Sequence, residues 1–286
     1  MCLTMTNNDD AGTVSKPSKA AAVSTSGLSK DFAGVMAVDH IDLRVDRGVF
    51  YGFLGPNGAG KSTTIKMLTG LLSPSAGTIE ILGLDMQADP VEVKRQIGVV
   101  PEDMALFDRL TGLEYLTFVG QLYRLNRSVA SNRARELMEF MDLTESHKKL
   151  IADYSHGMKK KISLAAALIH TPKVLFLDEP FEGVDAIAAK TMKNTLQSMI
   201  NGGATIFLTS HVLDIVERLC SHVGIINRGV LVAQGSLEEL RSGIQTSHDA
   251  AGVAHDNRPM TLEEVFVDII GGAQGMPEQT LAWLKE

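Results

Sequence analysis

The sequence predicts an α/β fold, in which a mostly parallel sheet is covered by helices on both faces. Short apolar segments alternate with segments of helical spacing, as expected for parallel strands joined by right-handed crossovers. Residues Val174–Leu177 are continuously apolar, which is typical of a strand buried on both faces. A glycine-rich segment at residues 55–63 lies between an apolar run and a helical pattern. These three observations together predict a parallel αβα core.

Length, composition and charge describe an ordinary soluble globular protein. The chain has 286 residues, of which 44% are apolar, enough for a large core and one or two domains. The net charge of −7 predicts no nucleic-acid partner, because no basic excess is available to neutralise phosphates. No apolar run reaches the ~18–20 residues that span a bilayer, and Met1–Ala22 lacks the features of a signal peptide. We therefore expect a cytoplasmic protein without direct membrane insertion.

Strands are expected on both sides of the glycine-rich segment. Residues 1–24 are rich in small and polar side chains and are predicted to form a disordered leader. A folded domain is then expected over residues 25–243. Its first strands are predicted at Val35–Val38, Ile41–Val45, Val49–Leu54, Gly77–Leu82 and Ile97–Val100.

Residues 103–170 are predicted to form an inserted helical subdomain. Its helices are expected at Gly112–Leu125, Val129–Met141 and Lys159–Ile169. The sheet then resumes with strands at Val174–Leu177 and Thr205–Thr209, a hairpin at Val223–Ala233, and helices at Ala186–Ile200 and Val212–Leu219. Residues 244–286 are expected to hold a loop over 244–259 and short helices at Leu262–Ile270 and Glu278–Leu284.

The glycine-rich segment is predicted to bind phosphates. Its residues are Gly55, Pro56, Asn57, Gly58, Ala59, Gly60, Lys61, Ser62 and Thr63. The glycines let backbone N–H groups point at a β-phosphate, and the following helix adds its positive end. Lys61 is expected to bridge the β- and γ-phosphates, Ser62 to bind Mg²⁺, and Thr63 to cap the helix. The alternative, a glycine-rich turn without a ligand, does not account for the flanking strand and helix.

Two carboxylates follow the apolar strand Val174–Leu177. Asp178 is expected to hold Mg²⁺ through water, and Glu179 to orient or deprotonate the attacking water. An exposed turn is the alternative interpretation. The position at the carboxyl end of a buried strand, downstream of a phosphate loop, favours the functional one.

With these motifs in this order, the chain from about Leu28 to Leu240 resembles the nucleotide-binding subunit of ABC transporters. The resemblance implies a P-loop NTPase of ABC type, with a mostly parallel αβα core, an antiparallel β subdomain and an inserted helical subdomain. It also implies that the chain binds ATP with Mg²⁺ and hydrolyses it.

The family's signature motif corresponds to Tyr154–Met158. In the family this segment acts across a dimer, so the resemblance implies that Ser155 and Gly157 face the partner's γ-phosphate. The basic run Lys159–Lys161 either adds positive charge near the phosphate or forms a solvated helix face.

Three further segments match the family. His211 matches the switch histidine that contacts the γ-phosphate and steadies Glu179, although a histidine before a helix is commonly a cap or surface residue. Phe32 matches the aromatic residue that stacks on adenine, with a core position as the alternative. Gly183–Asp185 resembles the loop that joins the two subunits.

The chain departs from the family at two positions. Glu102 replaces the usual Gln, and its carboxylate is expected to ligate Mg²⁺ but to repel the γ-phosphate if left unpaired. His156 replaces a usual Gly, which costs energy if the backbone there requires positive φ. Neither change removes the residues expected to carry the chemistry, so we predict an active ATPase.

The resemblance also implies partners. These are a multi-span membrane permease, docked near Glu102 and the segment Met104–Glu114, and a second copy of the chain or a related ATP-binding subunit. The chain would then lie on the cytoplasmic face of the cell membrane. Thr261–Phe266 resembles a tail helix of exporter subunits. One alternative is a soluble ABC ATPase of translation, repair or cluster assembly; another, a P-loop kinase or GTPase, gives no reason for the signature or His211.

Overall fold

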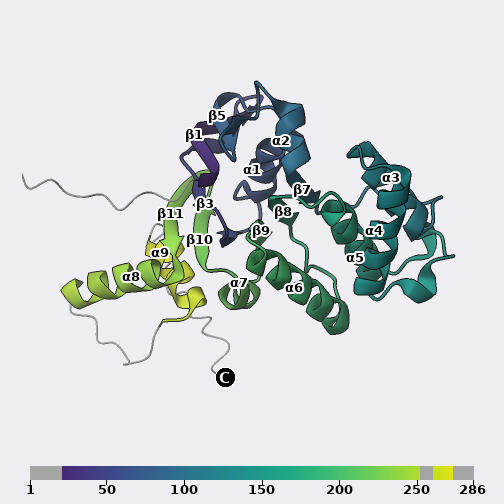
Figure 1. Cartoon of the computed structure of the whole chain (residues 1–286). Helices are drawn as coiled ribbons and strands as arrows, with labels where there is room; N and C mark the ends of the chain where they lie inside the picture. The colour runs from purple at the N-terminus through teal and green to yellow at the C-terminus, as the bar shows by residue number, and fades with distance from the viewer. Residues whose placement is uncertain (1–20, 252–259, 273–286) are drawn as a thin grey trace, which may run out of the picture.

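The computed structural model describes residues 21–251 and 260–272 (Figure 1). Within these residues, six strands form one sheet in the order β11-β10-β4-β9-β8-β7. All neighbouring pairs in it are parallel except β10 and β11. The strands are β4 (Phe50–Leu54), β7 (Ile97–Val100), β8 (Val174–Asp178), β9 (Thr205–Ser210), β10 (His222–Asn227) and β11 (Val230–Ser236). The predicted, mostly parallel core is confirmed.

The three central strands are buried along their whole length, and their carboxyl ends meet at one edge. Every residue of β4, β8 and β9 is buried, which explains their nearly continuous apolar sequences. Leu54 pairs with Ser210, and Asp178 with Thr209. The loops that follow these strands therefore lie side by side.

Helices and a second sheet cover the two faces of this core. Alternate residues of β8 enter two different apolar clusters, Leu175 and Leu177 on one face and Val174 and Phe176 on the other. The helices of the core region are α1 (Lys61–Leu68), α2 (Pro90–Gln96), α6 (Ala186–Asn201) and α7 (Leu213–Leu219). Apolar residues of α6 and α7 join the first cluster, whereas those of α1 and α2 join the second.

The second sheet is antiparallel and begins earlier than predicted. Its strands are β1 (Ala21–Phe32), β2 (Val35–Ile41), β3 (Arg44–Asp46), β5 (Ala76–Ile81) and β6 (Leu84–Asp85). The disordered leader predicted to run through residue 24 is wrong for Ala21–Ser24, because this segment pairs with β3 and β5 and buries Ala22 and Val23. The single strand predicted at Ile41–Val45 is divided between β2 and β3.

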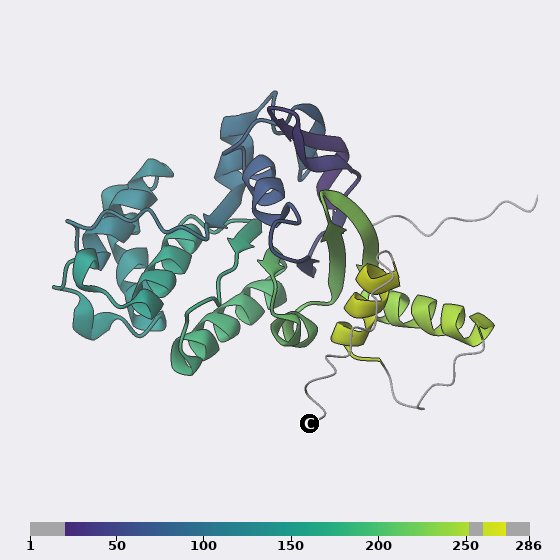
Figure 2. The same ribbon diagram turned by 180° about the vertical axis from the view of Figure 1, so that it is seen from behind.

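A helical block lies beyond the β7 end of the parallel sheet, drawn in teal in Figure 1. It contains α3 (Gly112–Leu122), α4 (Arg127–Phe140) and α5 (His156–Leu168), with short 3-10 turns at Thr144–Ser146 and Ile151–Asp153. Thr111 starts α3 with a capping box to Glu114, and Asn126 caps α4. The three helices lie where helical spacing predicted them. Viewed from behind, the block remains apart from the antiparallel sheet (Figure 2).

The chain continues after β11 into two helices, α8 (Leu237–Ala251) and α9 (Leu262–Gly272). The loop predicted over 244–259 is wrong for residues 244–251, where α8 passes through Gly243 without ending. One internal glycine costs only about 1 kcal/mol, so it does not by itself end a helix. The leader up to residue 20, residues 252–259 and the helix expected at Glu278–Leu284 lie outside the described residues. Among the described helices, none has the length and apolar character that crossing a membrane requires.

Candidate functional site

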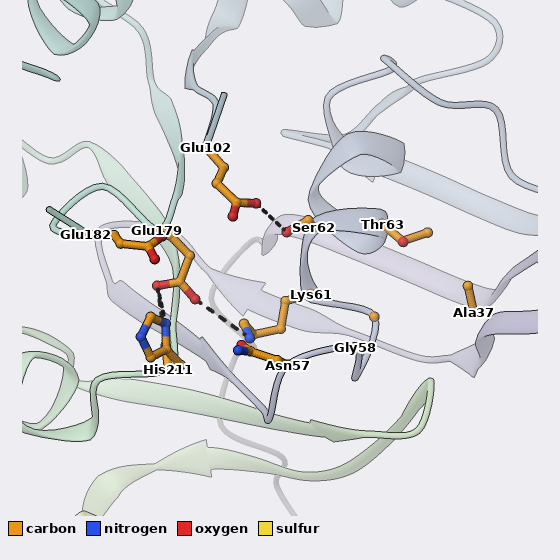
Figure 3. Close-up of a pocket in the computed structure, with 11 residues that line it drawn as sticks. Ala37, Asn57, Gly58, Lys61, Ser62, Thr63, Glu102, Glu179, Glu182 and His211 are labelled. Carbon is orange, nitrogen blue, oxygen red and sulfur yellow. Dashed lines mark hydrogen bonds and ion pairs between the residues drawn. The ribbon is translucent and has the colours of Figure 1, made fainter. Parts of the chain in front are cut away.

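A cavity of about 420 Å³ opens at the edge where the carboxyl ends of β4 and β8 meet (Figure 3). Its walls come from the glycine-rich loop and α1, from β2, and from the segments that follow β7, β8 and β9. The lining residues are Ala37, Asn57, Gly58, Gly60, Lys61, Ser62, Thr63, Glu102, Glu179, Glu182 and His211. Nine of these eleven residues were expected in the site from sequence; Ala37 and Glu182 were not.

The glycine-rich loop requires glycine at two positions. Gly60 has φ of 110° and ends the loop as the N-cap of α1. A Cβ atom there would lie 2.6 Å from the Ala37 carbonyl oxygen, and one at Gly55 would lie 2.4 Å from the Ile226 carbonyl oxygen. The prediction that Thr63 caps the helix is wrong, because α1 begins at Lys61 and Thr63 is already inside its first turn.

Lys61 places its ammonium between the loop and the carboxylates. Its Nζ donates to the carbonyl oxygen of Gly55 at 2.9 Å and lies 3.7 Å from Glu179 Oε1. The residue is only 7% exposed, yet it lines the cavity. A buried cation at a helix N-terminus has the charge and position to bind an anionic phosphate.

The side-chain oxygens of Ser62, Glu102 and Asp178 lie close together next to Lys61. The Ser62 hydroxyl lies 3.3 Å from Glu102 Oε2 and 3.3 Å from Asp178 Oδ1. Oxygen ligands of this kind suit Mg²⁺, which completes its shell with water and phosphate oxygens. The described residues contain no group of three His, Cys, Asp or Glu side chains able to hold a metal, so a hydroxyl and outside oxygens would be needed here.

Burial has the largest effect on the pKa of Asp178. It raises the pKa of this carboxyl group above its ordinary value, and nearby Glu179 acts in the same direction. Hydrogen bonds from Thr209 and Ser62 act to lower it. The Thr209 hydroxyl donates to Asp178 Oδ1 at 2.6 Å, which is a strong contact to an ionised carboxylate.

Glu179 is held against His211 in a strained backbone conformation. His211 Nδ1 lies 3.1 Å from Glu179 Oε2, and the His211 backbone N–H donates to the same oxygen at 3.4 Å. Glu179 is 6% exposed and has φ of 46°, a left-handed conformation that costs a non-glycine residue about 1–3 kcal/mol. Strain of this kind persists where the surroundings over-determine a side chain's position, as at active sites.

The signature segment begins α5. The Ser155 side chain caps this helix by accepting from the Met158 N–H at 3.3 Å, and Gly157 is buried in its first turn. His156 is the first helical residue and does not adopt positive φ, so the expected cost of replacing glycine does not arise. Its Nε2 lies 3.2 Å from the Glu182 carbonyl oxygen. Neither Ser155 nor Gly157 lines the cavity.

Phe32 and the segment Gly183–Asp185 lie outside the cavity lining. Phe32 ends β1 and is 47% exposed, with the Lys30 ammonium 5.2 Å from its ring centre. This exposure excludes the alternative of a core position. Asp185 caps α6 by accepting from the Ile187 and Ala188 N–H groups.

Two buried polar groups that contact Glu179 could not be assigned from the sequence. Thr209 in β9 and Lys160 in α5 contact the backbone of Glu179 on its two sides. The sequence places Thr209 only at the end of a predicted strand and Lys160 only within a run of three basic residues. A polar residue inside an otherwise buried element is the signal that both share.

Residues 38–182 match the family described as ABC transporter. The daunorubicin/doxorubicin resistance ATP-binding protein DrrA of Streptomyces peucetius is 37% identical over 85% of this chain and 75% of its own length. The bacitracin transport ATP-binding protein BcrA of Bacillus licheniformis is 38% identical over 86% of this chain and 80% of its own length.

A solved structure titled as an ATP-binding subunit of an ABC transporter superposes with a TM-score of 0.78. It is 30% identical and covers 87% of this chain and 99% of that one. An ATP-binding cassette in a post-hydrolysis state bound to ADP and Pi shares the fold, with a TM-score of 0.69 at 21% identity, over 75% of this chain and 98% of that one. The fold, the site and these relatives agree: the chain belongs to the ABC transporter family, as an ATP-binding subunit that hydrolyses ATP.

Proposed function

We propose that this chain powers the export of a small molecule through a separate membrane permease, with Mg²⁺-ATP bound between two ATP-binding subunits. The relatives named for resistance and antibiotic transport support export, and they do not favour a soluble ABC ATPase. The second subunit is a further copy of this chain or a related one. The observation that carries the proposal is the convergence of Lys61, Glu179 and His211 in one cavity.

The cavity residues have distinct roles in this proposal. Lys61 binds the β- and γ-phosphates, and Ser62, Asp178 and Glu102 hold Mg²⁺ directly or through water. Glu179 orients or deprotonates the attacking water, and His211 contacts the γ-phosphate. The contacts among these side chains support this assignment.

The remaining groups complete the site from other directions. Ser155 and Gly157, at the N-terminus of α5, bind the γ-phosphate held by the partner subunit. Their position outside this chain's own cavity supports a role across a dimer. The exposed ring of Phe32 stacks on the adenine base.

ATP hydrolysis then drives a mechanical cycle. Both subunits hold the triphosphate, and their closure excludes water from the carboxylates. Loss of the γ-phosphate removes the charge that joins the subunits, so they separate. The permease converts closure and opening into movement of its substrate.

The permease docks on an apolar surface of the helical block, at the cytoplasmic face of the membrane. This surface is formed by Leu106, Phe107, Leu110 and Phe118 around a hollow of about 560 Å³. Phe107 is 55% exposed and packs edge-on against Phe118 at 5.5 Å. Large exposed aromatics of this kind mark protein interfaces, and the surface adjoins the segment that follows Glu102.

Co-purification from membranes tests this proposal. The tagged chain should retain a multi-span membrane protein that mass spectrometry identifies, and Phe107→Asp should release that protein because a charge enters an apolar interface. Leu122→Asp, at an apolar position of α3 that is 65% exposed, is the control and should retain it. Recovery without any multi-span protein, or equal retention by both variants, would contradict the proposed partner.

A further inference from the structure

Lys160 is a buried cation of the helical block. It lies in α5, four residues after the helix begins, and is only 2% exposed. Its Nζ donates to the carbonyl oxygen of Glu179 at 3.2 Å. Burying an ammonium group is costly unless its charge and protons are compensated, so this placement requires an explanation.

Lys160 and Thr209 hold the backbone of Glu179 from its two sides. On the other side, the Glu179 N–H donates to the Thr209 hydroxyl at 3.1 Å. Glu179 has φ of 46°, and buried side chains bind both its backbone N–H and its backbone carbonyl oxygen. Two such contacts over-determine a left-handed conformation that would otherwise relax.

The carboxylates that act on Lys160 belong to the candidate site that contains Glu179. Burial lowers the pKa of the Lys160 ammonium below its ordinary value, whereas four carboxylates act to raise it. These are Glu182, Glu102, Asp178 and Glu179. Glu102 follows β7 and the other three follow or end β8, so Lys160 brings a positive charge from the helical block to the acidic groups of the core.

We propose that Lys160 is a positioning residue for ATP hydrolysis, through which α5 fixes the backbone and hence the carboxylate of Glu179. The inference rests on the proposed role of Glu179. Lys160 connects α5, the helix that begins with the signature segment, to Glu179 in the same subunit. A shift of α5 therefore displaces Glu179. The Nζ of the neighbouring Lys161 instead lies 4.0 Å from Asp142 Oδ2 on the helical block, and its charge also acts on Asp185 rather than on the backbone of Glu179.

The test compares variants of the purified full-length chain with Mg²⁺-ATP as the probe. Lys160→Met should lower kcat at least tenfold while changing KM less than threefold, because the phosphate-binding residues are untouched. Lys160→Arg should recover at least a third of the parent kcat. Lys161→Met, a control matched in burial, should stay within twofold of the parent.

A purely structural role of Lys160 would not lower kcat while leaving KM nearly unchanged. It predicts parallel loss in Lys160→Met and Lys161→Met, or a loss of binding together with turnover, and either result would overturn the inference. If Lys160→Met does not fold, Lys160→Gln keeps a neutral donor, and it should still lose kcat relative to Lys160→Arg. A kcat for Lys160→Gln equal to that of the parent would likewise overturn it.

A comparison with Glu179→Gln separates this inference from the proposed function. Glu179→Gln should abolish turnover; if it does not, both the role of Glu179 and the inference fail. If Glu179→Gln is inactive but Lys160→Met retains kcat within twofold, only the inference fails.

Discussion

A single hydroxyl beside the end of β8 contacts the carboxylate of Asp178 and the backbone N–H of Glu179. Thr209 donates to Asp178 Oδ1 and accepts from the Glu179 N–H, and it is completely buried. One uncharged side chain in β9 thus orients the expected Mg²⁺ ligand and the expected base together. Fixed dipoles of this kind let charged groups sit in a site of low exposure without reorganising during the reaction.

We expect the buried Asp178 carboxylate to lower the stability of the folded chain at neutral pH. Burial raises its folded-state pKa, so the folded chain binds more protons than the unfolded chain between the ordinary value of 3.8 and the raised value. Stability therefore falls as pH rises through that window and stays lowered above it. Asp178→Asn removes the buried charge while its amide oxygen still accepts from Thr209 and Ser62. We expect Tm at pH 7 to rise on the order of 2 °C.

Thermal unfolding of parent and variant between pH 4 and 8, without nucleotide, measures this effect. The difference in Tm should shrink toward the acidic end, where the parent carboxyl group is protonated. Asp214→Asn, at an exposed position in α7, is the control and should produce no such trend. A variant that is less stable than the parent at pH 7 would show that the ionised carboxylate stabilises the fold.

At the residue scale, contiguous motifs are the part of the candidate site that could be interpreted from the sequence, and their roles stay predictions. The spacing from Gly55 to Ser62 and the pair Asp178–Glu179 could be interpreted without a structure, because strand and helix context fixes their directions. Lys160, Thr209 and Glu182 could not be assigned, since their contacts join elements far apart in the chain.

The tail helix α9 is joined to the core through α7. Leu262 is 1% exposed and belongs to the first apolar cluster, and its N–H donates to Glu217 Oε1 at 3.2 Å. The same Glu217 carboxylate pairs with Arg241 of α8. Glu217 therefore ties both C-terminal helices to the helix that follows His211.

Leu262→Ala is expected to destabilise the chain by about 2–4 kcal/mol, because it removes a fully buried side chain from the start of α9. Urea unfolding at equilibrium gives the change in free energy. Val267→Ala lies in the same helix at a position 57% exposed and should cost less than about 0.5 kcal/mol. Equal costs for the two variants would mean that α9 does not pack as described.

At the element scale, the errors have physical causes. β1 was not predicted over any part of Ala21–Phe32, because its mostly short and polar side chains give no clear alternation and its burial comes from pairing with neighbouring strands. α2 went unpredicted, as its seven residues bury only Val93 within the helix. α8 went unpredicted: a loop was expected over residues 244–259, whereas the helix runs through Gly243 to Ala251.

At the scale of the whole molecule, three parts of the fold contribute residues to the candidate site and its surroundings. The parallel sheet holds the phosphate loop and the carboxylates at one edge, the antiparallel sheet contributes Ala37, and the helical block carries Ser155 and the proposed docking surface around Phe107. The resemblance to ABC transporter subunits implied these three parts of the fold, although not the contribution of Ala37. The relative placement of the parts could not be predicted, since it depends on packing between distant segments.

The proposed function requires that ATP joins two copies of this fold. Sedimentation of full-length Glu179→Gln with Mg²⁺-ATP tests it most directly, because hydrolysis cannot reopen the complex. A homodimer should appear at about twice the chain mass of 30.8 kDa, and Mg²⁺-ADP should leave single chains. Adding Gly157→Asp should abolish the dimer while ATP binding persists. If Glu179→Gln remains a single chain while saturated with ATP, self-pairing through the nucleotide is contradicted.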